Sequence, residues 1–219
     1  MRVYYLTNAN FALSNVALRR LKIARFSDLN DPFEMLAVDL ADRDYRAAFK
    51  KMKDELSLDN GLICFSKSWT NPLLWGHYAD KHTGICLGFD IKDERLSTVY
   101  YSKTPMRIGV DSKSGQPIIT DEMINRLMRT KFSDWKYEDE MRVFISLDHR
   151  TRESGLYFKE FDTDMVLREI ILGPRCELPI SGVRAMVQSF TPEVTVIKSR
   201  IAFSSFRVIK SKSGSKVSA

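Results

Sequence analysis

The sequence predicts an α+β fold. Segments with strand-like alternation and segments with helical periodicity are mixed, and they do not follow the regular strand–helix–strand order of a doubly wound sheet. The 219 residues include 44% hydrophobic and 28% charged residues, which is typical of a globular protein and fits one domain. We therefore expect a single α+β domain over residues 1–208, followed by a basic flexible C-terminal tail at residues 209–219.

The strands are expected where β-branched and aromatic residues alternate with polar ones or form short apolar runs. These segments are residues 2–7, 22–27, 61–66, 84–90, 98–103, 141–146, 169–172, 194–198 and 202–208. Helices are expected where apolar residues recur every three or four positions, with a polar capping residue in front. These are residues 10–20 after Asn10, 42–56, 72–79 after Thr70 or Asn71, 120–132 from Thr120, and 181–190.

The composition excludes several classes of protein. No apolar run approaches the ~20 residues that cross a bilayer, and the N-terminus lacks the features of a signal peptide. The three cysteines, Cys64, Cys86 and Cys176, fit neither a disulfide framework nor a paired zinc site. We therefore expect a reduced, cytoplasmic protein without a membrane partner.

The net charge of +6 is concentrated at one end of the chain. Residues 1–197 carry as many basic as acidic side chains, and no Asp or Glu follows residue 197. Six basic residues lie in that last segment: Lys198, Arg200, Arg207, Lys210, Lys212 and Lys216. Such an end can hold a nucleic acid through its phosphates, or it can simply keep the protein soluble.

Familiar catalytic motifs are absent from the sequence. It contains no GxGxxG, Walker lysine loop, HExxH or GxSxG. The histidines, His77, His82 and His149, lack the spacing of a metal site, so no metal is expected. The chemistry must therefore come from aromatic and carboxylate clusters.

The first cluster is aromatic. Ser66 ends a buried strand, and Trp75 and Tyr78 lie three residues apart on the following helix. Two such rings can form a stacking wall for a flat heterocycle, or they can be ordinary core residues. The turn at residues 28–34 is read mainly as a rigid turn, in which Asn30 or Asp31 can still touch a ligand.

The second cluster is charged. With a period of two, Met141, Val143 and Ile145 share one face of a strand, and Glu138, Glu140, Arg142 and Phe144 share the other. A carboxylate in a cleft can hold a sugar hydroxyl and stabilise an oxocarbenium-like transition state. Arg142 can keep that carboxylate ionised or bind a phosphate. The alternative is a solvated row of ion pairs on an edge strand.

Taken in order, these segments resemble a bacterial family known as domain of unknown function 2971. The resemblance rests on Tyr4-Tyr5, Leu29-Asn30-Asp31-Pro32-Phe33-Glu34, Phe65-Ser66, Leu74-Trp75-Gly76-His77-Tyr78, Gly84-Ile85-Cys86-Leu87-Gly88-Phe89, Glu140-Met141-Arg142 and Ile171-Leu172-Gly173-Pro174. It spans roughly residues 3 to 208, and the combination is more specific than any one piece. The family name implies no activity.

A more distant resemblance is to the ADP-ribosyltransferase superfamily, and it implies a split mixed β-sheet with flanking helices. In that superfamily a His or Arg on the first strand, a Ser or Tyr at mid-chain and a later Glu form the site. The matching residues here are Tyr4 or Tyr5, then Ser66 with Trp75 and Tyr78, and then Glu138 or Glu140. No His occupies the first strand, and Arg2 can replace it only if it points inward.

This resemblance implies an NAD-dependent ADP-ribosyltransferase, with a role in phage defence or as a toxin. NAD would be the substrate, Trp75 or Tyr78 would stack its nicotinamide, and Glu140 would hold the ribose 2′-hydroxyl. One alternative is a non-catalytic nucleotide- or nucleic-acid-binding module. Another is a nucleic-acid enzyme that binds a divalent metal through Glu138, Glu140 and Asp31.

Overall fold

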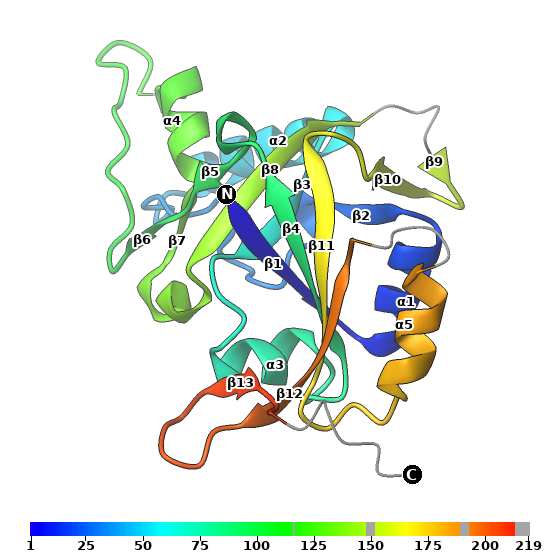
Figure 1. The fold of residues 1–219 in the computed structure, drawn as a ribbon. Coiled ribbons are helices and arrows are strands. Elements are labelled where there is room, and N and C mark those ends of the chain that lie inside the picture. The colour runs from blue at the N-terminus through cyan, green and yellow to red at the C-terminus, as the bar shows by residue number, and fades with distance from the viewer. Residues whose placement is uncertain (116, 148–151, 189–192, 213–219) are drawn as a thin grey trace, which may run out of the picture.

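The computed structural model describes residues 1–115, 117–147, 152–188 and 193–212. These residues form an α+β fold with one large mixed sheet and helices packed around it, as predicted (Figure 1). No helix among these residues is long and apolar enough to cross a membrane. The tail predicted at residues 209–219 falls outside the described residues from residue 213 onward.

Within the described residues, eleven strands make up the large sheet. In chain order they are β1 (Arg2–Thr7), β2 (Arg20–Arg25), β3 (Asn60–Ser66), β4 (Ile85–Ile91), β5 (Ser97–Thr98), β8 (Glu140–Ser146), β9 (Arg152–Glu153), β10 (Leu156–Glu160), β11 (Met165–Leu172), β12 (Thr195–Ile201) and β13 (Val208–Lys210). Their order across the sheet is β13-β12-β11-β4-β1-β3-β2-β10-β9, and β8 pairs with β3 and β5. The β11–β12 pair is parallel and the other pairs are antiparallel.

A separate parallel pair consists of β6 (Tyr100–Ser102) and β7 (Thr130–Phe132). The segment at residues 98–103, predicted as one strand, is thus divided between two sheets. The pattern did not predict β9 and β10. The strand predicted at residues 202–208 was wrong, because β13 begins only at Val208 and runs past the expected domain boundary.

The helices are α1 (Ala9–Ala17), α2 (Arg43–Asp59), α3 (Pro72–Tyr78), α4 (Asp121–Leu127) and α5 (Ile180–Gln188), with 3-10 turns η1 (Phe26–Asp28), η2 (Asp93–Arg95) and η3 (Ser133–Glu138). Asn71 caps α3 and Pro72 opens it, because proline fits the first helical turn. Asn8, rather than the predicted Asn10, caps α1. The α4 helix ends at Leu127, five residues before the predicted end, and the chain then enters β7.

Side chains from the two faces of the sheet form the core. On one face, Val3 and Leu87 pack with residues of α1 and α5. On the other face, Trp75 of α3 packs against Cys86, Ile171 and Val208. A third cluster joins α2 to β3 through Phe49 and Leu62. Figure 1 shows α1 and α5 side by side at one flank of the sheet, with α3 below the central strands.

The sheet opens between β1 and β3. One edge of β3 pairs with β8 along its whole length, from Asn60 to Ser66. Its other edge pairs with β1 only at Ser66, opposite Tyr4, and with β2 only at Gly61 and Leu62. The β1 and β2 strands therefore diverge along β3. Residues 63–65 lie between these two contacts, and the divergence leaves room for a cavity there.

Candidate functional site

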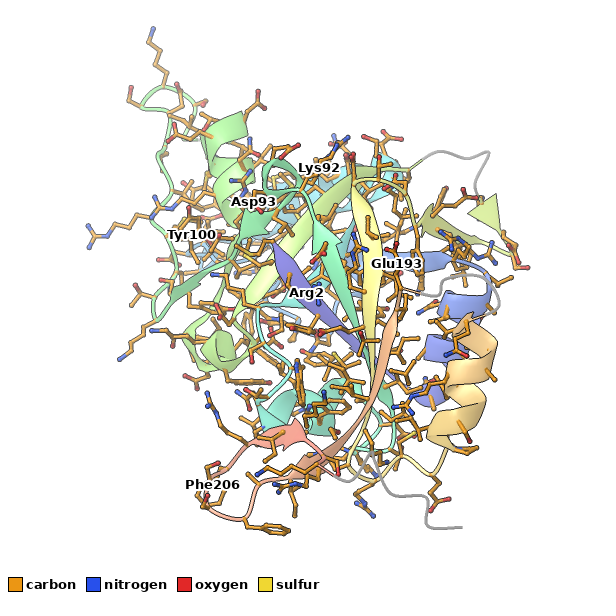
Figure 2. The ribbon with its side chains drawn as sticks, in the orientation of Figure 1. Arg2, Lys92, Asp93, Tyr100, Glu193 and Phe206 are labelled. Atoms are coloured by element: carbon orange, nitrogen blue, oxygen red, sulfur yellow. The ribbon has the colours of Figure 1, made fainter. Side chains whose placement is uncertain are left out.

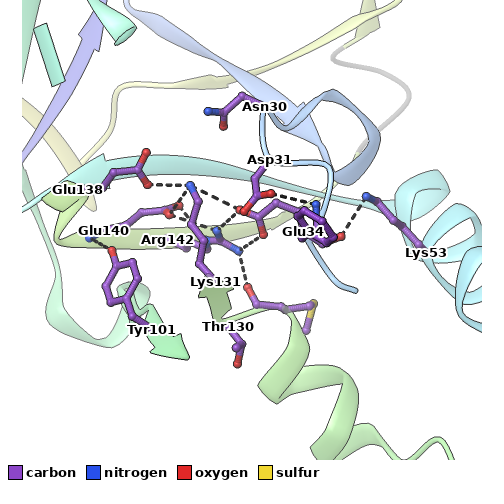
Figure 3. A network of polar contacts seen from close by, with 12 residues as sticks. Asn30, Asp31, Glu34, Lys53, Tyr101, Thr130, Lys131, Glu138, Glu140 and Arg142 are labelled. Carbon is purple, nitrogen blue, oxygen red and sulfur yellow. Dashed lines mark hydrogen bonds and ion pairs between the residues drawn. The ribbon is translucent and has the colours of Figure 1, made fainter. Parts of the chain in front are cut away.

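Arg142 is at the centre of a buried charge network, shown in Figure 3. It lies on β8 and is fully buried. Its Nε and Nη2 donate to Glu140 at 2.8 and 3.1 Å, and Nη1 and Nη2 donate to Glu34 at 3.1 and 2.6 Å. Nη1 also donates to the carbonyl of Met128 at 2.7 Å. All five guanidinium N–H groups are thus used, and two carboxylates are held in a fixed orientation.

Lys131 supplies the second buried cation. Its Nζ lies 2.7 Å from a Glu138 oxygen, 3.5 Å from Glu140 and 3.7 Å from Glu34. It also lies 4.7 Å from the centre of the Trp135 ring. The side chain is only 3% exposed, because β7 directs it between the carboxylates. The carboxylates in turn raise the pKa of Lys131 above its ordinary value, although burial alone would lower it.

Glu138 and Glu140 lie on different elements of the backbone. Glu138 is the last residue of η3, and Asp139 then takes the left-handed conformation, with φ 45°, before β8 begins. This turn brings both glutamates to the same side of the strand. The Tyr78 hydroxyl donates a hydrogen bond to one Glu138 oxygen and accepts a hydrogen bond from Asn30 at 3.0 Å. Glu138 is thus held by Tyr78 and Lys131 together.

The network has more buried negative than positive charge. Glu34, Glu138 and Glu140 are carboxylates, and Lys131 and Arg142 are the cations beside them. Two cations cannot neutralise three carboxylates, so one carboxylate has no full counter-charge. That carboxylate is the group of the network that is most easily protonated. Burial raises the pKa of Glu138 above its ordinary value, and Lys131 and Tyr78 only partly oppose that rise.

Glu140 behaves in the opposite way. Burial alone would raise its pKa, but Arg142 and Lys131 outweigh burial and hold the pKa below the ordinary value. The two glutamates are therefore different acids, although they lie two residues apart. A pair of carboxyl groups whose pKa values are driven apart is the arrangement that assigns one group to proton transfer and the other to charge stabilisation.

A cavity of about 300 Å³ lies where β1 and β3 diverge. The charged residues that line it are Glu34, Lys131, Glu138 and Glu140 of the network, together with Lys22 and Asp28. The other lining residues include Tyr4, Tyr5, Asn30, Cys64, Ser66 and Tyr78. Burial raises the pKa of both Tyr4 and Tyr5 to about 12, so their hydroxyl groups stay neutral at physiological pH. The cavity thus combines apolar walls with a few polar groups, as ligand sites do.

Residues 74–143 match the model of a family described as "Protein of unknown function (DUF2971)". In this part the chain is similar to DUF2971. The DUF2971 match runs from α3 to β8, so it includes Tyr78, Lys131, Glu138, Glu140 and Arg142. It does not include Glu34. Searches of curated proteins and of solved structures gave no significant match to the chain.

Six of the predicted site residues line this one cavity: Tyr4, Tyr5, Ser66, Tyr78, Glu138 and Glu140. They come from β1, β3, α3, η3 and β8, so the fold brings together segments that are far apart in the sequence. The hydroxyl of Ser66 is already used, because it donates to the carbonyl of Ser68 at 2.9 Å and accepts from the Ser68 N–H at 3.2 Å. Its role in the cavity is therefore mainly to shape the wall.

Two predicted residues do not line the cavity. Trp75 is fully buried, and its Nε1 donates to the carbonyl of Trp69 at 2.6 Å, so its predicted role in stacking a ligand was wrong. Arg142 cannot bind a phosphate, because its donors are already used and none of its surface is exposed. Its contact with Glu140 fits the other predicted role, that of keeping a carboxylate ionised.

Two further expectations are also corrected. Glu138 does not belong to the strand whose alternation predicted its direction, because it ends η3. Arg2 turns away from the cavity and pairs with Asp90 at 2.6 Å and Glu169 at 3.1 Å. It therefore does not replace the missing first-strand histidine.

Sequence reasoning missed Lys131 and Glu34. The pattern of residues 120–132 predicts one helix that includes Lys131, whereas the chain leaves the helix after Leu127. The Thr130-Lys131-Phe132 segment has a β-branched and an aromatic residue around the lysine, which is a weak strand signal. The sequence places Glu34 only in a turn motif. Glu34 comes three residues after Asp31. The Oδ1 of Asp31 accepts a hydrogen bond from the N–H of Phe33 at 2.9 Å and fixes that turn.

Proposed function

We propose that this chain is an NAD-dependent ADP-ribosyltransferase and that its reaction takes place in the cavity between β1 and β3. The observation that carries the proposal is that Glu138 and Glu140 both line the cavity but have different partners: Arg142 holds Glu140, and Lys131 and the Tyr78 hydroxyl hold Glu138. These surroundings lower the pKa of Glu140 and raise that of Glu138, so Glu140 is kept ionised and Glu138 is easier to protonate. Glycosyl transfer through an oxocarbenium-like state uses these two functions.

The size of the cavity limits how NAD can bind. About 300 Å³ is at the lower end of the range of roughly 300–1,000 Å³ in which small ligands bind. The nicotinamide and its ribose would occupy the cavity, and the adenosine half would remain outside. Tyr78 would stack the nicotinamide from the α3 side, because Tyr78 lines the cavity whereas Trp75 is buried in the core.

In the proposed reaction the bond between the ribose C1′ and the nicotinamide nitrogen breaks. The electron pair leaves with the nicotinamide, which becomes neutral, and positive charge develops on the ribose. The Glu140 carboxylate, ionised because of Arg142, stabilises that charge and accepts a hydrogen bond from the 2′-hydroxyl. An acceptor nucleophile then attacks C1′, and its proton goes to Glu138.

The test is incubation of the protein with labelled NAD and cell extract, measuring both label transfer and nicotinamide release. Wild type should be active, and Glu140→Gln and Glu138→Gln should each lose most of the activity. Glu55→Gln is the matched control, because the Glu55 side chain is 63% exposed on α2. Equal turnover by wild type and Glu140→Gln, or no turnover by wild type, would contradict the proposal.

Growth of cells that express wild type or Glu140→Gln tests a role as a toxin or in phage defence. A toxic or protective effect that requires Glu140 would support that setting. An effect shared equally by both proteins would contradict it.

One observation favours a second candidate, a non-catalytic nucleotide-binding module. Both oxygens of Glu138 and both oxygens of Glu140 already contact donors within the protein. Catalysis would require at least one of these contacts to be exchanged for a substrate contact. Calorimetry with NAD separates the two candidates, because tight binding without nicotinamide release supports the module.

The metal-dependent alternative has less support from the geometry. The ammonium of Lys131 lies between Glu34, Glu138 and Glu140, at the place where a cation would bind. A divalent metal would have to displace Lys131 or share these carboxylates with it. Activity that resists a chelator would exclude this alternative.

A further inference from the structure

The hairpin of β12 and β13 ends in a loop, residues 202–207, that exposes two phenylalanines. Phe203 is 90% exposed and Phe206 is 98% exposed, although both rings are large and apolar. Figure 2 shows Phe206 at the outer end of this loop, away from the sheet. Exposed aromatic rings on a projecting loop are typical of an interaction surface.

Basic residues flank the two rings. The Arg200 guanidinium lies 4.9 Å from the centre of the Phe203 ring. Arg207 and Lys210 are exposed on the other side of the hairpin, and Lys212 is exposed just beyond it. No acidic residue follows position 197 in the sequence, so no carboxylate of this segment offsets these charges. The loop therefore fits a partner that is both anionic and able to contact aromatic rings.

The base of the loop is held to the domain. The Val208 N–H donates to the carbonyl of Thr70 at 2.8 Å, and the Val208 side chain is fully buried in the cluster that includes Trp75. The Ala202 N–H donates to the carbonyl of Arg207 at 2.9 Å and closes the loop. Trp75 therefore anchors the hairpin to α3. The same helix carries Tyr78 as its last residue, and Tyr78 lines the cavity.

We propose that the residue 202–207 loop is a docking element for single-stranded nucleic acid. Unpaired bases stack on Phe203 and Phe206, and Arg207 and Lys210 hold the phosphates, which is how proteins bind single strands without strict sequence preference. A duplex binds less well because its bases are already stacked. Two exposed serines, Ser204 and Ser205, separate the rings and would lose their hydration in a bilayer, so the loop suits a nucleic acid better than a lipid surface.

This inference stands independently of the proposed reaction, because it concerns affinity rather than turnover. If both hold, the nucleic acid is the class of acceptor that the loop brings to the enzyme. Failure of the NAD assay would leave the docking measurement unaffected, and failure of docking would leave NAD turnover unaffected.

The experiment measures fluorescence anisotropy of a short, mixed-sequence single-stranded RNA with the full chain, and with the same sequence as single-stranded DNA and as a duplex. Wild type should bind a single strand more tightly than the duplex. The Phe203→Ala/Phe206→Ala double variant should bind at least about tenfold more weakly. Phe33→Ala is the matched control, because Phe33 is 66% exposed on a different surface. Arg207→Ala should reduce the slope of log affinity against log salt by roughly 0.7.

Several results would overturn the inference. Equal affinity of wild type and the double variant would show that the rings make no contact, and an equal loss in Phe33→Ala would show that the loop is not special. Ring-dependent binding to vesicles of phosphatidylserine and phosphatidylcholine, without binding to either single strand, would assign the loop to membranes instead. Both alanine substitutions remove rings that are at least 90% exposed, so the variant should unfold at nearly the same urea concentration as wild type.

Discussion

Lys131→Met tests the buried network most directly. The lysine contacts three carboxylates, at 2.7, 3.5 and 3.7 Å, with 3% of its side chain exposed. Methionine keeps a similar volume but removes the charge, which leaves Arg142 as the cation among Glu34, Glu138 and Glu140. Removing one partner from a buried ion pair costs about 3–5 kcal/mol, because the remaining charge is left uncompensated. We therefore expect the free energy of unfolding to fall by about that amount at pH 7.5.

The loss should depend on pH in a defined direction. Burial raises the pKa of Glu138, and Lys131 opposes the rise, so removing Lys131 raises that pKa further. The folded state then retains a proton that the unfolded chain loses near pH 4.3, roughly the ordinary glutamate value. The free energy of unfolding therefore falls as pH rises from that value to the raised pKa. At pH values above the raised pKa, the loss of unfolding free energy is about 1.4 kcal/mol for each unit by which the pKa of Glu138 has risen. The deficit should be smaller at pH 5 than at pH 7.5.

Urea unfolding followed by tryptophan fluorescence at the two pH values gives the measurement. Lys51→Met is the control. Lys51 is 79% exposed, so this substitution should change the free energy of unfolding by no more than about 0.5 kcal/mol. Adding Glu138→Gln to Lys131→Met should restore stability at pH 7.5, because one excess carboxylate is removed. The reasoning fails if Lys131→Met costs less than about 1 kcal/mol, or if its cost is the same at both pH values.

Three further outcomes are expected. Tyr78→Phe keeps the ring but removes the hydroxyl that donates to Glu138, so nicotinamide release should fall about tenfold or more. Its free energy of unfolding should fall by about 1.5–3 kcal/mol, the range for a hydrogen bond to a charged group, and unchanged turnover would count against a role for the hydroxyl. Turnover should rise with pH as Glu138 loses its proton. In wild type the Tyr78 hydrogen bond lowers the pKa of Glu138, so Tyr78→Phe should raise that pKa and move the rise in turnover to higher pH; a move to lower pH would contradict the assignment. Trp75→Ala should lower the free energy of unfolding by about 3–5 kcal/mol in a urea titration, because a fully buried indole is removed, and a loss below about 1 kcal/mol would show that it is not a core residue.

The sequence predicted the directions of the β8 side chains, because the alternation of side chains along a strand is enough to determine them. Met141, Val143 and Ile145 pack into the core, and alternation then places Glu140 and Arg142 on the opposite face. The same rule failed for Glu138, whose direction depends on a left-handed residue at Asp139. A single positive φ angle in an aspartate has no distinct sequence signature, because many aspartates lie in turns.

The incorrect prediction for Trp75 and the failure to predict Lys131 both arise from tertiary contacts. Tyr78 and Trp75 lie on the same short helix, and spacing alone gives both the same chance of facing a ligand. The core decides between them, because β13 brings Val208 against Trp75 while Tyr78 extends toward Asn30 and Glu138. Lys131 was missed because helical periodicity continues past Leu127, although the backbone enters a strand to pair with β6. Neither contact is visible before the distant segments are placed.

The buried network is not explained by stability alone. A buried ion pair is at best a weak source of stability, and apolar side chains of similar volume often do as well or better. Here Glu34, Glu138, Glu140, Lys131 and Arg142 are each at most 5% exposed, and their charges do not cancel. An arrangement selected only for folding would balance the charges or fill the space with apolar residues. The excess carboxylate instead lies at the wall of a cavity, beside a tyrosine hydroxyl and at the opening of the sheet, which is the position that the proposed proton transfer requires.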